Sequence, residues 1–148
     1  AGVDGVILSG VPPDEAPELW ASCDRAGLDT VVLAAPTTDP ARLPLLIARA
    51  RGFVYCLART GVTGGGAGEA VDLVGRVAAL RRLTRLPVAV GFGISTPAQA
   101  RALIGVADGA IVGAAFMRAI ASDPGHGATA RVLELGEELM SALGAPAA

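Results

Sequence analysis

One local pattern, repeated five times, constrains what this chain can fold into: a short apolar run is followed by a longer amphipathic stretch. The runs are rich in Val, Ile and Leu at nearly every position, as in parallel strands that are covered on both faces. Consecutive parallel strands need a crossover, and a helix provides it with right-handed geometry. The pattern therefore predicts an α/β fold of five parallel βα units.

The predicted elements divide the chain without an obvious linker. Strands are expected at 5–8, 30–34, 53–57, 88–91 and 109–112. Helices are expected at 13–26, 40–51, 69–83, 96–103 and 128–143, with a short extra helix at 114–121. Several helices open with a capping side chain and a proline in the first turn, as residues 95–97 (Ser-Thr-Pro) illustrate. Five such units fit either an open doubly wound sheet or part of a (β/α)8 barrel.

The composition predicts one globular domain spanning residues 1–148. Hydrophobic residues make up 52% of the chain, which is enough for a sizeable core. No apolar run is long enough for a membrane span, and no charged segment followed by a short apolar run marks a secretion signal. The net charge of −2 and the 3% of aromatic residues argue against nucleic acid as a partner.

Cysteine usage points to a cytoplasmic protein. Cys23 falls in a predicted helix and Cys56 in a predicted strand, without the paired spacing of a zinc or redox motif. Both thiols are therefore expected to be buried and reduced, and no metal site is expected.

Glycines mark the carboxyl ends of three predicted strands. Residues 59–64 (Arg-Thr-Gly-Val-Thr-Gly) follow the third strand, residues 91–95 (Gly-Phe-Gly-Ile-Ser) end the fourth, and Gly113 follows the fifth. At such an edge, glycine lets backbone N–H groups approach an anion closely. A tight turn explains any one of these glycines. Three at corresponding places, with a short helix starting at Ala114, predict a phosphate site.

The same strings resemble the signature of the tryptophan synthase alpha subunit family. Residues 52–55 (Gly-Phe-Val-Tyr), 59–64 and 87–95 (Pro-Val-Ala-Val-Gly-Phe-Gly-Ile-Ser) carry the likeness, and residues 1–5 and 35–38 match the family's fourth and fifth units. The resemblance runs through nearly the whole chain. It implies strands four to eight of a (β/α)8 TIM barrel, with the N-terminal strands one to three absent.

The resemblance also implies an activity. The family is a carbon–carbon lyase of tryptophan biosynthesis, which cleaves indole-3-glycerol phosphate to indole and glyceraldehyde 3-phosphate in a reverse-aldol step. Such a step needs two proton-handling groups beside the reacting bond. The family takes a Glu and an Asp from its second strand and the loop that follows, so no catalytic residue is expected here. The 148 residues alone are therefore expected to be inactive.

Partners and cofactors follow from the same resemblance. The barrel would need no cofactor, because pyridoxal phosphate belongs to the beta subunit, with which the family forms an alpha2-beta2 complex. The small-molecule partner would be the phosphate-bearing substrate. Because five strands cannot close such a barrel, a second chain or the missing N-terminal part is expected to cover the exposed strand edges.

Position by position, the resemblance assigns binding roles within this chain. The phosphate cradle, formed mostly by backbone N–H groups, would consist of Gly64, Gly93, Gly113 and Ala114. The side chains that bind the substrate around its indole ring would be Tyr55, Phe92, Ile7, Ala34 and Ile111. The lid loop over the substrate would include Arg59, Thr60 and Thr63. By residue type alone, Tyr55 is equally explained as a core side chain with a satisfied hydroxyl, and the apolar residues as core.

Three features depart from the family pattern. Ala114 replaces the usual Ser, which removes a hydroxyl donor but keeps the amide. Gly10 replaces an Asp that is thought to position the site and communicate with the beta subunit, although a plain turn glycine explains it as well. Residues 64–68 are richer in glycine than the family's lid, so ordering the lid is expected to cost more backbone entropy.

Two functional classes stay open. In the first, the chain is part of the lyase and supplies its phosphate site and part of its indole pocket. In the second, it is a catalytically silent phosphate-binding fragment or assembly module. A third, weaker class is another phosphate-binding barrel, such as indole-glycerol-phosphate synthase or a ribulose-phosphate epimerase. The chain contains no Lys, which argues against a synthase that needs a catalytic lysine.

Overall fold

The computed structural model describes residues 2–58, 72–91, 93–122 and 127–144. Its strands are β1 (Gly5–Ile7), β2 (Asp29–Ala34), β3 (Val54–Leu57), β4 (Val88–Gly91) and β5 (Gly109–Ile111). Its helices are α1 (Pro17–Arg25), α2 (Leu43–Ile47), α3 (Leu73–Leu83), α4 (Pro97–Arg101), α5 (Ala114–Ser122) and α6 (Ala128–Ala142). Every predicted element is present, in the predicted order.

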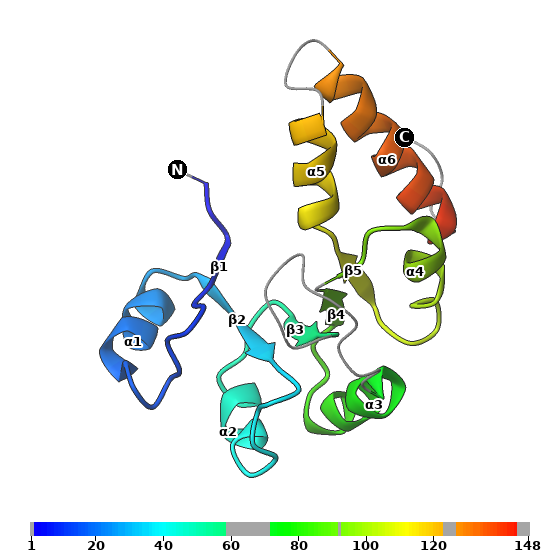
Figure 1. Cartoon of the computed structure of the whole chain (residues 1–148). Coiled ribbons are helices and arrows are strands. Elements are labelled where there is room, and N and C mark those ends of the chain that lie inside the picture. The colour runs from blue at the N-terminus through cyan, green and yellow to red at the C-terminus, as the bar shows by residue number, and fades with distance from the viewer. Residues whose placement is uncertain (1, 59–71, 92, 123–126, 145–148) are drawn as a thin grey trace.

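The strands form a single parallel sheet in which spatial order follows chain order, β1-β2-β3-β4-β5. A doubly wound sheet reverses its strand order at a switch point, and this sheet does not. Each right-handed crossover therefore returns on the same side, and the helices lie around the outside of the strands (Figure 1). The fold is α/β, a half-barrel of the (β/α)8 TIM type.

The hydrophobic core lies between the sheet and its helices. Alternate residues of neighbouring strands point into it, as Val54, Cys56 and Val90 do with no exposed surface. Val77 and Leu80 of α3 pack against the same cluster. Burying such side chains contributes about 1.5–3 kcal/mol each, so this layer supplies most of the stability. Both cysteines are free and buried, as predicted.

Helix α4 is slightly shorter than the predicted 96–103, and α1 and α2 are much shorter than predicted. Proline-containing turns before α1 and α2 account for the larger differences. The N–H groups of Glu15 and Ala16 both bond the carbonyl of Pro12, so the chain makes a turn there and α1 begins only at Pro17. The carboxylate of Asp39 caps a separate turn by accepting from the N–H of Ala41, and α2 is confined to Leu43–Ile47. A proline in the first turn costs no helical hydrogen bond, because that N–H is unpaired anyway.

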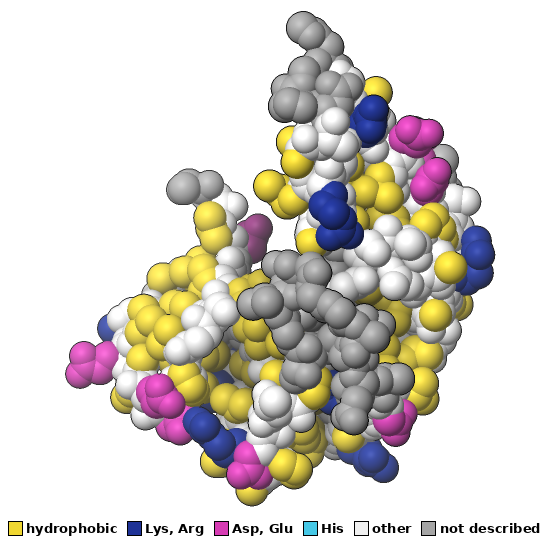
Figure 2. All heavy atoms as spheres, viewed as in Figure 1, with side chains coloured by type: hydrophobic (Ala, Val, Ile, Leu, Met, Phe, Trp, Pro, Cys, Tyr) yellow, Lys and Arg dark blue, Asp and Glu magenta, His cyan; other side chains and the backbone are white. Residues whose placement is uncertain are grey.

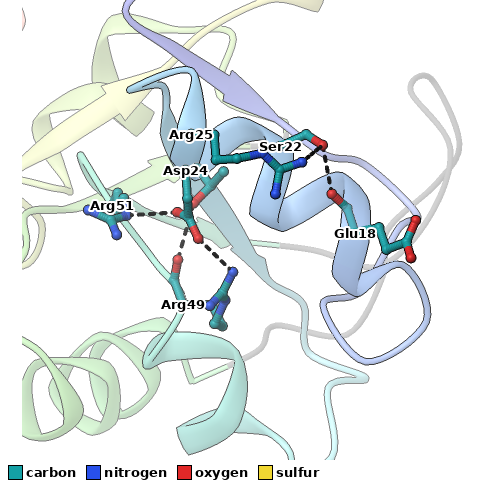
Figure 3. Close-up of polar contacts among 7 residues, drawn as sticks. Glu18, Ser22, Asp24, Arg25, Arg49 and Arg51 are labelled. Atoms are coloured by element: carbon teal, nitrogen blue, oxygen red, sulfur yellow. Dashed lines mark hydrogen bonds and ion pairs between the residues drawn. The ribbon is translucent and has the colours of Figure 1, made fainter.

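Ion pairs join α1 to the loop before β3 at the amino-terminal edge of the sheet. The Asp24 carboxylate lies 2.9 Å from the Arg49 guanidinium and 3.2 Å from that of Arg51 (Figure 3). The Arg49 guanidinium also lies 6.0 Å from the ring centre of Trp20. Each exposed pair contributes about 0–1 kcal/mol, so the cluster orients the loop more than it stabilises the fold.

The two outer strands, β1 and β5, each pair with a single neighbour in the described part of the chain. Large hydrophobic side chains are exposed beside them, including Ile7 on β1 and Met117 and Ile120 on α5. Figure 2 shows hydrophobic side chains over β1 and α1 on one side of the molecule and over α5 and α6 on the other. Among the described helices, none combines the length and the apolar character needed to cross a membrane.

Candidate functional site

The sheet face turned away from the helices, here called the inner face, carries the residues predicted to meet the substrate. Register places Leu33, Tyr55 and Ala89 side by side in one row across β2, β3 and β4. Gly91 and Ile111 pair in the next row, one step closer to the carboxyl ends of the strands. Paired residues of parallel strands point to the same face, so Tyr55 and Ile111 share this face.

Tyr55, Gly91 and Ile111 are in close contact. A Cβ built on Gly91 would lie 2.6 Å from both Cε2 and the hydroxyl oxygen of Tyr55, and 2.9 Å from the Cβ of Ile111. The Tyr55 ring therefore crosses from β3 over the bare backbone of β4 and ends beside β5. Burial raises the pKa of the Tyr55 phenol above its ordinary value, so its hydroxyl keeps its proton at neutral pH. Two of the predicted substrate-binding residues thus form one half-buried apolar surface.

The other substrate-binding predictions fall in different places. Ile7 lies on β1 paired with Val31 on the inner face, and it is 47% exposed. Ala34 pairs with Cys56 and packs in the core on the helix side, opposite to the face of Tyr55. Its neighbour Leu33 has the inward position. Leu33 pairs with Tyr55 in the register, and successive strand residues point to opposite faces, so Leu33 and not Ala34 shares the face of Tyr55.

The strand ends beside this surface carry two of the predicted phosphate-binding residues. Gly93 and Gly113 each lie two residues beyond the Gly91–Ile111 pair, so they share the carboxyl edge of β4 and β5. Gly93 has a φ of 92°, a conformation that favours glycine. Among the described residues, leaving out its two chain neighbours, no heavy atom lies within 4 Å of the place where a Cβ on Gly113 would be. These two strand-end turns, here called corners, therefore lie at the same edge of the sheet.

Helix α5 begins directly at this edge with Ala114. The N–H of Met117 bonds the carbonyl of Gly113, which makes it the first internal hydrogen bond of the helix. The N–H groups of the preceding turn, including that of Ala114, are left without partners inside the helix. Together with the helix dipole they favour an anion at this point.

Several predicted residues lie outside the described ranges, and they are Gly64, Phe92, Arg59, Thr60 and Thr63. The structure therefore gives no geometry for the predicted lid or for one corner of the predicted phosphate cradle. Within the described ranges, no cluster of three or more His, Cys, Asp or Glu side chains is arranged to hold a metal ion.

One polar contact at the carboxyl ends of β2 and β3 was not predicted from the sequence. The Arg76 guanidinium of α3 donates to the carbonyl of Leu57 at 2.7 Å and to that of Ala34 at 3.0 Å. Burial raises the pKa of the neighbouring Cys56 thiol, and the positive charge of Arg76 lowers it in part. No local sequence pattern marks Arg76, because its partners lie 19 and 42 residues away.

Comparison with known proteins identifies the family of this chain. A family model described as the tryptophan synthase alpha chain matches residues 1–143. The chain belongs to that family. A tryptophan synthase alpha chain of Caulobacter sp. (strain K31) is 46% identical over 145 residues, covering 97% of this chain and 53% of the relative. One from Caulobacter vibrioides (strain NA1000 / CB15N) matches equally well. The chain thus spans about half the length of these curated members of the tryptophan synthase alpha family.

Solved structures of tryptophan synthases share the fold. One from Mycobacterium tuberculosis has a TM-score of 0.80 and 33% identity, covering 94% of this chain and 51% of the solved one. The alpha subunit from Campylobacter jejuni has a TM-score of 0.77 and 30% identity, with 93% and 54% covered. The a2b2 complex of Pyrococcus furiosus has a TM-score of 0.76 and 31% identity, with 95% and 54% covered.

Proposed function

We propose that this chain is part of a tryptophan synthase alpha subunit, a lyase that cleaves indole-3-glycerol phosphate to indole and glyceraldehyde 3-phosphate. Family membership supports the assignment. The observation that carries it is the arrangement at the carboxyl edge of β3 to β5. An apolar surface of Tyr55 and Ile111 lies next to the corners of Gly93 and Gly113. The substrate has the same two parts, a flat apolar ring and a phosphate.

The apolar surface would bind the indole ring. The Tyr55 ring and Ile111 would pack against it from one side, with Leu33 and Ile7 along the same inner face. Transfer of such a ring out of water is favourable by roughly 25 cal/mol per Å² of apolar surface buried. A neutral Tyr55 hydroxyl can also donate a hydrogen bond in this pocket.

The strand-end corners would bind the phosphate through backbone N–H groups of Gly93, Gly113 and Ala114, aided by the dipole of α5. Ala114 would contribute its amide but no hydroxyl, which makes this cradle weaker by one donor than a Ser-containing one. Gly64, Phe92 and the lid residues Arg59, Thr60 and Thr63 stay predictions of the sequence.

The reverse-aldol step itself needs proton-handling groups that this chain is not expected to supply. Indole C3 must gain a proton while the glycerol hydroxyl next to the breaking bond loses one. In the proposal those groups, a Glu and an Asp, come from the preceding strands, which would also cover the open edges of β1 and β5. A pyridoxal-phosphate-dependent beta subunit would be the partner, as the a2b2 complex of Pyrococcus furiosus suggests.

The test is release of indole from indole-3-glycerol phosphate. This chain would be assayed alone and after it is joined to the residues that precede the matched region in the Caulobacter sp. (strain K31) relative. We expect turnover only in the joined protein. Turnover by the chain alone would contradict the placement of the proton-handling groups. A folded joined protein that binds inorganic phosphate but releases no indole would favour the silent phosphate-binding module instead.

A further inference from the structure

Arg76 joins the carboxyl ends of two neighbouring strands. It lies on α3, and its Nη1 donates to the carbonyl of Leu57 at 2.7 Å while its Nη2 donates to the carbonyl of Ala34 at 3.0 Å. Leu57 is the last residue of β3 and Ala34 the last residue of β2. Hydrogen bonds from a charged donor are about twice as strong as neutral ones. A single side chain thus links both strand ends to α3 through hydrogen bonds.

The start of α3 fixes where this side chain can reach. The Asp72 carboxylate caps the helix by accepting from the N–H of Gly75, and the N–H of Arg76 bonds the carbonyl of Asp72. A Cβ on Gly75 would overlap an oxygen of the Asp72 carboxylate, so glycine permits this cap. The cap sets the first turn of α3 and therefore the direction of Arg76.

The two strand ends that Arg76 fastens also carry the inner-face residues. Tyr55 lies two residues before Leu57, and Leu33 lies one residue before Ala34. Between β2 and β3 the register contains three pairs, the last of which is Ala34 with Cys56. The two-pronged guanidinium of Arg76, here called the fork, bridges the two strands just beyond that last pair. A shift of either strand there would move Tyr55 relative to Leu33.

Among the described residues, no carboxylate forms an ion pair with Arg76, although its guanidinium is partly buried. The two strand-end carbonyls of Ala34 and Leu57 accept hydrogen bonds from this charged group. Replacing Arg76 by an apolar residue would leave both strand-end carbonyls without this donor. The fork geometry is specific to Arg.

We infer that Arg76 is a positioning residue that holds Tyr55 and Leu33 in the geometry that binds the apolar part of the substrate. The inference rests on the proposed function for the identity of the substrate. Arg76 acts through β2 and β3, so its side chain need not touch the substrate. Loss of the fork should therefore weaken substrate binding more than it slows the chemical step.

The experiment follows the ring of Tyr55 directly. Tyr55 is the single tyrosine of the chain, so fluorotyrosine labelling gives one ¹⁹F NMR signal, which Tyr55→Phe assigns. The signal would be compared in wild type, Arg76→Met and Arg76→Lys, with Arg82→Met as the matched control, since Arg82 is exposed on the same helix. In Arg76→Met we expect a shifted or broadened signal, in Arg76→Lys an intermediate one, and in Arg82→Met no change.

The same variants would be assayed in the protein joined to the Caulobacter residues. Arg76→Met should raise KM by about threefold to tenfold with kcat within about twofold, and Arg76→Lys should recover part of the loss. The inference is overturned if Arg76→Met matches Arg82→Met in both signal and KM. It is equally overturned if the variant only loses stability while the Tyr55 signal stays in place. Absence of indole release from the joined wild type would count against the proposed function, and the fluorine signal would still decide the role of Arg76.

Discussion

The ring of Tyr55 occupies the space that a side chain on Gly91 would need. A Cβ on Gly91 would lie 2.6 Å from the Tyr55 hydroxyl oxygen, well inside the contact distance of two heavy atoms. Neither residue is unusual by itself, since one is a strand tyrosine and the other a strand glycine. The close contact between the Tyr55 ring and Gly91 explains why a glycine, which weakens a strand, ends β4.

Replacement of Gly91 by alanine should displace the Tyr55 ring. We expect a loss of about 1–3 kcal/mol in the free energy of unfolding, as for other overpacked sites. Urea unfolding measures it. The control is Gly109→Ala on β5, where the nearest atom to a new Cβ is that of Ala89 at an ordinary 3.7 Å.

Trimming the ring should relieve the same overlap. In a Tyr55→Ala background, Gly91→Ala is expected to cost less than it does in wild type, which a double-mutant cycle detects as a coupling energy. Additive effects of the two substitutions would contradict the contact between the ring and β4.

Removal of the Asp108 carboxylate should destabilise the amino-terminal edge of β4. One oxygen accepts from the buried N–H of Val88 at 2.8 Å, and the other accepts from Arg81 at 2.8 Å. Asp108→Ala leaves the Val88 N–H without this acceptor, so we expect a loss of about 1–2 kcal/mol. Unfolding can be followed by the fluorescence of Trp20, the single tryptophan. Asp14→Ala, which removes an exposed ion pair to Arg42, should cost about 0.5 kcal/mol or less.

Loss of the Thr96 hydroxyl should weaken the start of α4. That oxygen accepts from the N–H of Gln99, while the Gln99 side chain accepts from the N–H of Thr96, which completes a capping box. Thr96→Ala should lower the unfolding free energy by about 1 kcal/mol. Ser22→Ala is the control, because its exposed hydroxyl makes hydrogen bonds within α1 alone, donating to the Glu18 carbonyl and accepting from Arg25 (Figure 3). Equal losses in the two variants would argue against the capping box.

Alkaline pH should act through Tyr55. Burial raises the pKa of its phenol above the ordinary 10.0, so the folded chain holds this proton more strongly than the unfolded chain. The resulting stability is fully present below the unfolded pKa and is lost as pH rises through the folded one. Absorbance at 295 nm should therefore titrate above pH 10 in buffer and near 10 in urea. Tyr55→Phe should flatten the fall in stability as the pH rises above about 10.

Much of the fold could be predicted from local patterns. The five apolar runs and their capping signals give all the elements in order, because strand and helix periodicity depend on near neighbours. The bounds of α1 and α2 could not be predicted. The pattern placed their starts at residues 13 and 40, but the turns closed by Pro12 and Asp39 occupy those positions.

The site divides in a similar way. Glycine-marked strand ends can be read from the sequence, and the parallel order then places Gly93 and Gly113 at one edge. The resemblance assigned Ala34, and the sequence did not show that Leu33 has the inward position, because β2 is apolar at successive positions and its alternation is hidden. Only the pairing of Leu33 with Tyr55 identifies the inward residue.

The sequence by itself therefore determined a series of parallel βα units, their order and the glycines at their carboxyl ends, because each depends on residues a few positions apart. The tertiary structure decided which face Tyr55 uses, why Gly91 must lack a side chain, and that Arg76 reaches two strand ends 19 and 42 residues away. Such contacts depend on how strands and helices far apart in the sequence pack together, and a local sequence pattern does not show this packing.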